Sequence, residues 1–119
     1  MIAFLSAADS VTLFLSVLTL GELRKGVEAK RRTDITAADR LGSWVDDIER
    51  IFADRVLPID TATARRWGEL SGARSLPVID TLIAATAVIH DLTLVTRNTR
   101  DIELTGVRFV DPWLAPDLD

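Results

Sequence analysis

Residues 80–96 read DTLIAATAVIHDLTLVT, an acidic residue followed by a long and nearly all-apolar run. The part from Asp80 to His90 predicts a helix that is buried on most of its sides, because it offers almost no polar face. The part from Leu92 to Thr96 predicts a strand from the interior of a sheet, since it is apolar and rich in β-branched residues. A buried helix followed by a buried strand is typical of an α/β domain.

The alternation of strands and helices continues on both sides of this stretch. We expect, in chain order, a strand (12–17), helices (18–27 and 37–52), an extended piece (56–59), a helix from Asp60 or Thr61 through Leu70, and a last strand (107–110) after a polar segment (97–106). The chain is expected to open with a helix fragment and not with a strand. We therefore predict one α/β domain over residues 1–119, with a mostly parallel sheet and a tail after about residue 113.

Composition and charge limit the possible functions. The chain of 119 residues has no cysteine and one histidine, so disulfides, thiolate metal sites and a cysteine nucleophile are excluded, and a metal site must use mainly oxygen ligands. A net charge of −4 disfavours binding nucleic acid by bulk attraction, so such contact must be local, near the basic residues of 24–32 or 97–100. Without a basic leader or an 18-residue apolar run, we expect a soluble, cytoplasmic protein that does not enter membranes.

Acidic and amide side chains follow the predicted strands at three places. Glu22 lies in the helix after the first strand, Asp80 begins the buried helix, and Asn98 with Asp101 follows the strand 92–96. In a parallel sheet these segments can meet at one edge, because ligand sites lie at the carboxyl ends of the strands. Carboxylates held close together repel unless a cation lies between them, and Mg²⁺ or Mn²⁺ is the natural one for oxygen ligands. Such an ion can activate water in phosphodiester cleavage.

Each of these side chains also has an ordinary structural role, which the sequence leaves open. Glu22 can pair with Lys25 or Arg24 on its own helix. Asp80 can be a plain N-cap. The remaining polar residues are Asn98 and Asp101, which suit a turn, and Arg97 and Arg100, which suit a solvated loop or, beside carboxylates, a phosphate site.

Four segments, taken in order, resemble the PIN-domain ribonucleases, and most of all the VapC-type toxins of bacterial toxin–antitoxin pairs. The likeness runs from about residue 3 to about residue 114. The segments are residues 15–26 (LSVLTLGELRKG), 79–87 (IDTLIAATA), 94–101 (LVTRNTRD) and 111–113 (DPW).

The resemblance implies an α/β/α sandwich and an Mg²⁺- or Mn²⁺-dependent endoribonuclease that hydrolyses RNA through an ion-activated water. It also implies a homodimer and inhibition by a cognate antitoxin. By position, Glu22 and Asp80 match acidic metal ligands of the family. The family's fourth acidic position falls on Asn98, an amide, and Asp101 three residues later can take over part of its role. Arg97 or Arg100 would steady the substrate phosphate.

One departure from the family lies at the amino end. Members begin with a strand that carries an aspartate followed by Thr and Asn, and no such segment precedes Met1. Asp9 cannot replace it, because it lies before the strand that matches the family's second one. We therefore expect an N-terminally truncated sheet with unpaired central edges, weak Mg²⁺ binding, and little or no nuclease activity.

Two rival functions remain beside the ribonuclease. The chain can be a catalytically inert PIN remnant that pairs with itself or binds an antitoxin. It can also be a structural α/β domain whose carboxylates are caps and surface charges, in which case Mg²⁺ would not affect thermal melting.

Overall fold

The computed structural model describes residues 3–6, 12–72, 75–96 and 99–111 of the chain. The expected tail after about residue 113 lies outside these residues. The elements, in chain order, are β1 (Ala3–Ser6), β2 (Thr12–Ser16), α1 (Val17–Arg31), α2 (Ile35–Ile51), β3 (Val56–Leu57), α3 (Thr61–Ser71), α4 (Val78–Ile89), β4 (Thr93–Val95), α5 (Thr99–Glu103) and β5 (Phe109–Val110). Within these ranges no helix is both long enough and apolar enough to cross a membrane.

The five strands form one sheet in the order β3-β2-β1-β4-β5. The pairs β2–β3 and β4–β5 are parallel, whereas β1 is antiparallel to both β2 and β4. Four strands therefore run in one direction, and β1 runs in the opposite direction. The prediction of a mostly parallel sheet is confirmed. Phe4 of β1 lies opposite Phe14 on one side and Leu94 on the other.

The strand β1 corrects two of our expectations. The chain does not open with a helix fragment, because residues 3–6 form a strand. The centre of the sheet does not have unpaired edges either, because β1 bonds to β2 and to β4. A four-residue apolar segment is too short for its periodicity to distinguish a strand from a helix, which is why the sequence misled here.

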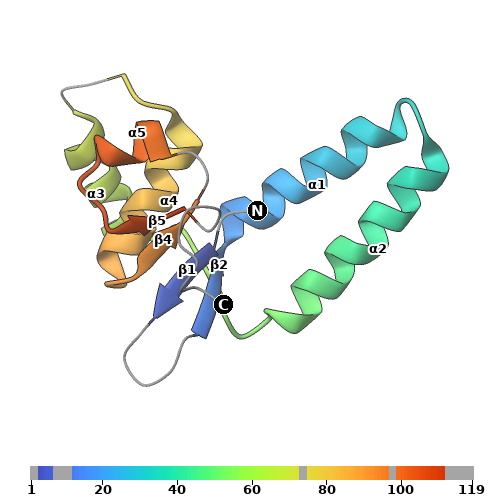
Figure 1. The fold of residues 1–119 in the computed structure, drawn as a ribbon, viewed down its shortest axis with the longest axis horizontal. Coiled ribbons are helices and arrows are strands. Elements are labelled where there is room, and N and C mark those ends of the chain that lie inside the picture. The colour runs from blue at the N-terminus through green and yellow to red at the C-terminus, as the bar shows by residue number, and fades with distance from the viewer. Residues whose placement is uncertain (1–2, 7–11, 73–74, 97–98, 112–119) are drawn as a thin grey trace.

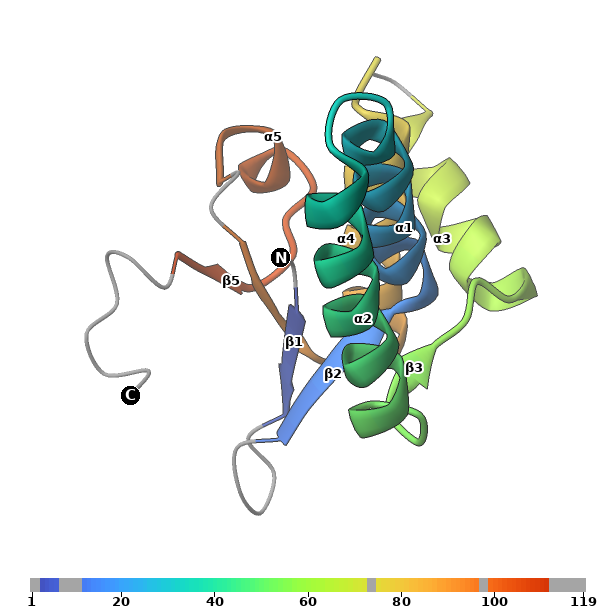
Figure 2. The same cartoon turned by 90° about the vertical axis from the view of Figure 1, so that its right-hand side faces the viewer.

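The helices lie in two groups around the sheet (Figure 1). A hairpin of α1 and α2 extends to one side, while α3, α4 and α5 lie together on the other. Figure 2 shows α1 and α2 side by side along their length. Helix α4 is buried as its composition predicts, and the main core cluster forms around it. The cluster consists of Ile83, Ala84, Ala87, Leu92, Leu94, Ile102 and Val107.

Local side chains determine where three of the helices begin. Ser16 caps α1 by accepting a hydrogen bond from the Leu18 N–H at 3.0 Å. Asp34 and Asp60 cap α2 and α3 in the same way, with bonds of 3.0 and 2.9 Å. The predicted start of α3 at Asp60 is therefore confirmed. Helix α5 was not predicted, because its five residues lie within a polar segment and are too few to show helical periodicity.

Candidate active site

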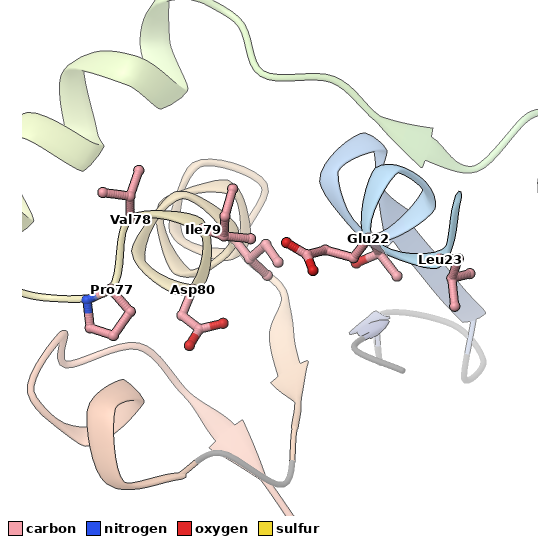
Figure 3. A pocket seen from close by; sticks show the side chains of 8 residues that line it. Glu22, Leu23, Pro77, Val78, Ile79 and Asp80 are labelled. Atoms are coloured by element: carbon pink, nitrogen blue, oxygen red, sulfur yellow. The ribbon is translucent and has the colours of Figure 1, made fainter. Parts of the chain in front are cut away.

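A pocket of about 550 Å³ lies between the first turns of α1 and the beginning of α4. It brings together Glu22 and Asp80, which are far apart in the sequence but belong to helices that meet beside the carboxyl end of β2 (Figure 3). The rest of the lining is mainly apolar and consists of Thr19, Leu23, Pro77, Val78, Ile79 and Ile83. The Glu22 side chain is exposed and that of Asp80 is half-buried, so both carboxylates can be reached by a hydrated cation from solution.

Glu22 lies in the second turn of α1, on the side that faces α4. Its carboxylate extends from α1 toward α4 in Figure 3. In the described part of the chain neither Lys25 nor Arg24 pairs with it, because Arg24 instead bonds Asp46 and Glu49 of α2. Glu22 is exposed on its helix, as the structural alternative expects, but the ion pair with Lys25 or Arg24 is not formed.

Asp80 lies in the first turn of α4 but does not cap that helix. The N-cap position belongs to Pro77, and no side chain makes a capping hydrogen bond there. The plain N-cap alternative for Asp80 is therefore wrong. The Asp80 side chain is half-buried, and in Figure 3 it points away from α4 toward the pale orange ribbon of α5 and β5. A negative charge in the first turn of a helix is stabilised by the helix dipole.

A hydrogen-bond network next to Asp80 was missed by the sequence analysis. The Trp67 indole Nε1–H of α3 donates to Thr81 Oγ1 at 3.1 Å. The Thr81 hydroxyl in turn lies 2.6 Å from the carbonyl oxygen of Pro77 and 3.1 Å from that of Val78. Thr81 is only 1% exposed. The signal in the sequence was the tryptophan itself, since an indole N–H that packs against another helix usually finds an acceptor there.

The other predicted site residues are placed less completely. Asp101 lies in the first turn of α5, half-buried and outside the pocket lining, on a helix that contacts α4. The turn-forming alternative for Asp101 is wrong, because the residue is helical. Arg100 is exposed on the same helix and not in a loop. Arg97 and Asn98 lie outside the described residues.

Few of the described side chains near the pocket can act as ligands for a divalent ion. No three Asp, Glu, His or Cys side chains of the described ranges come close enough together to hold a metal. Two carboxylates nevertheless line one pocket, and Thr19 is a further polar residue of its lining. Mg²⁺ is commonly bound through one or two carboxylates and keeps several waters, so this pair of oxygen ligands suits it. The described residues thus offer two carboxylates on one pocket and no third ligating side chain beside them.

The fold and pocket define a class of protein. It is an α/β domain with a mostly parallel sheet, in which acidic side chains from two helices share a pocket beside the end of a strand. Comparison with known protein families identifies which family has this fold and pocket. The PIN domain model matches residues 2–107, and the chain belongs to the PIN domain family.

Several relatives match most of the chain. VapC ribonuclease Y4jK of Sinorhizobium fredii (strain NBRC 101917 / NGR234) is 34% identical over 121 residues, which cover 94% of this chain and 83% of the relative. Toxin FitB of Neisseria gonorrhoeae (strain ATCC 700825 / FA 1090) is 30% identical over 121 residues, covering 94% and 84%. The crystal structure of FitAcB from Neisseria gonorrhoeae superposes with a TM-score of 0.76 at 30% identity, over 85% of this chain and 76% of that chain.

Proposed function

We propose that this protein is a metal-dependent endoribonuclease toxin of a toxin–antitoxin pair. The observation that carries the proposal is the shared pocket of Glu22 and Asp80 in a chain of the PIN domain family. The relatives' names support the choice of class, since they include a VapC ribonuclease and a toxin.

Glu22 and Asp80 would hold a Mg²⁺ or Mn²⁺ ion, directly or through water. When bound, the ion would supply an activated water and neutralise charge on the phosphodiester. Asp101 would complete the acidic set from α5, together with Asn98. Ile79 and Ile83 form apolar walls of the same pocket. Arg100, and Arg97 three residues before it, would bind the phosphate of the RNA substrate.

The proposal extends to two protein partners. A cognate antitoxin is supported by the likeness to Toxin FitB and to FitAcB, a name that joins FitB to a second component. A homodimer is consistent with large apolar side chains on the surface of α2, where Trp44 is 44% and Ile51 is 55% exposed. Light scattering of the purified protein, with Trp44→Glu as the disrupting variant, would establish the oligomer.

An inert binding module is the second candidate. It is favoured by one observation, which is that no group of three metal-ligating side chains forms in the described part of the chain. Such a module would bind the antitoxin or a second copy without cleaving RNA.

Cleavage of a mixed RNA pool with Mn²⁺ separates the two candidates. We expect the purified protein to cleave only weakly, because the family's first aspartate has no counterpart among its residues, and we expect EDTA or Asp80→Asn to abolish that cleavage. Asp54→Asn is the matched control, because it removes an exposed carboxylate from the turn that follows α2, outside the pocket lining. Cleavage that resists EDTA or survives in Asp80→Asn would contradict the proposed site. An intact RNA pool, with antitoxin binding retained, would instead establish the binding module.

A further inference from the structure

The basic residues of α1 divide into two groups with different surroundings. Arg24 and Arg31 face α2 and form ion pairs across the hairpin, Arg24 with Asp46 and Glu49 and Arg31 with Asp39 at 2.9 Å. Lys25, Lys30 and the C-cap residue Arg32 are exposed and form no ion pair with any described residue. The hairpin therefore neutralises only the cations that face inward.

The unpaired cations lie on the side of α1 that continues from the pocket. Residues 22, 25, 26 and 29 follow the spacing that places side chains on one helix face, and Lys30 lies four residues beyond Gly26. Each of these residues is exposed, whereas Val27, on the side that packs against α2, is 2% exposed. Lys25 and Lys30 thus flank a strip formed by Gly26 and Ala29, and Lys30 lies about 12 Å along the axis from Glu22.

The strip between the cations leaves the helix backbone accessible. A Cβ atom added at Gly26 would meet nothing within 4 Å, and Ala29 adds only a methyl group. A polymer lying along this strip can approach α1 closely while cationic side chains reach it from both flanks. The remaining surface of a chain with net charge −4 would repel the same polymer, so the contact must be local.

We propose that this outer face of α1, formed by Lys25, Gly26, Ala29, Lys30 and Arg32, binds the phosphate backbone of single-stranded RNA next to the pocket. The inference rests on the proposed ribonuclease function and adds the surface that holds the substrate. Lysine and arginine side chains bind phosphates whatever the base sequence. This face would therefore contribute to the affinity for RNA and fix the position of the strand, but it would not select a sequence. The pocket at Glu22 then receives the phosphodiester that lies at the end of this track.

The test measures RNA binding in the absence of cleavage. Asp80→Asn in EDTA blocks the chemistry, and fluorescence anisotropy of a labelled single-stranded RNA gives the binding constant at several salt concentrations. The variant adds Lys25→Gln, Lys30→Gln and Arg32→Gln to Asp80→Asn. The matched control adds Arg50→Gln, Arg65→Gln and Arg66→Gln, which remove equal charge from α2 and α3.

We expect the α1 variant to bind RNA more weakly than the parent. The slope of log K against log salt concentration should become less steep by about 2, since three phosphate contacts are lost and each contributes about 0.7 on a single strand. The control should keep the slope of the parent. Equal losses in both variants, an unchanged slope, or no RNA binding by the parent would overturn the inference. The result is separable from the nuclease proposal, because binding that depends on α1 without any cleavage in Mn²⁺ would refute only the chemistry.

Discussion

At the scale of single residues, Thr81 connects the candidate site to the rest of the protein. Asp80 and Val78 line the pocket from a turn that has no capping side chain. The adjacent Thr81 hydroxyl donates to the carbonyl oxygen of Pro77 and accepts from Trp67 of α3. The first turn of α4, which carries Asp80, is thus linked to α3 by a side-chain hydrogen bond.

We predict that Thr81→Val destabilises the protein and reduces cleavage, whereas Thr81→Ser retains both. Valine removes the acceptor of the Trp67 N–H and the donor to the Pro77 carbonyl, and a hydrogen bond of this kind contributes about 0.5–1.5 kcal/mol. Urea unfolding would measure the free energy of unfolding, and single-turnover cleavage at saturating Mn²⁺ would measure the rate. A Thr81→Val protein with the parent's rate under folding conditions would show that the network supports stability alone.

The roles of single residues could be predicted from the sequence only where they depend on neighbours in the chain. Asp60 was identified as a cap because capping depends on residues three apart. The position of Asp80 at the beginning of a buried helix was also readable from the apolar run. The Trp67–Thr81 bond was not, since it depends on how α3 packs on α4. The shared pocket of Glu22 and Asp80 was likewise not readable from any single residue. It exists because β2 and β4 run in the same direction, which the predicted fold class suggested.

At the scale of elements, α3 is held at its beginning by a titratable cap. The Thr63 backbone N–H donates to Asp60, and this bond lowers the pKa of the Asp60 carboxyl below its ordinary value. A carboxyl whose pKa is lowered by folding stabilises the protein above its unfolded pKa of about 4 and loses that contribution as the pH falls through the folded pKa.

We predict that Asp60→Asn removes this part of the acid sensitivity. Asparagine caps helices about as well as aspartate but carries no proton to titrate. The unfolding free energies of parent and variant should therefore be similar near pH 6, and the parent should lose more as the pH falls below about 4. Urea titrations at pH 6 and pH 3 would provide the four values. Equal losses in both proteins at pH 3 would show that the cap does not contribute to acid unfolding.

Long helices were predictable and short elements were not. The second helix was expected over residues 37–52 and spans Ile35–Ile51, because its apolar stripe repeats over four turns. The stripe packs Val45 and Ala38 against α1, and both are fully buried. The elements β1 and α5 have four and five residues, too few for a period to emerge. Their placement comes from tertiary pairing, which no local pattern encodes.

At the scale of the whole molecule, β1 joins two halves of the sheet. The half formed by β3 and β2 continues into the α1–α2 hairpin, and the half formed by β4 and β5 lies with α4 and α5. Among the strands that the structure describes, only β1 bonds to both halves. The pocket lies between helices that belong to different halves, so its shape depends on this antiparallel strand.

We predict that Leu5→Pro severely destabilises the protein, far more than Leu5→Ala. Both variants lose the leucine side chain, but only proline removes a backbone N–H from the middle of a sheet and locks the backbone angle φ. Differential scanning calorimetry would compare their melting temperatures, and light scattering would detect aggregation through the freed edges of β2 and β4. Similar melting temperatures would mean that β1 does not hold the two halves together.

The central position of β1 has a consequence for the order of assembly. Its partner β2 follows it closely in the chain, whereas Leu94 of β4, which lies opposite Phe4, comes roughly ninety residues later. During synthesis the β1–β2 pair therefore leaves the ribosome with the edge of β1 open, and that edge stays open until residues 93–95 have been made. Closing such a distant contact is slow, so the nascent protein is vulnerable to aggregation and proteases until β4 has paired. The two halves of the sheet, and with them the pocket, would come together only in that late step of folding.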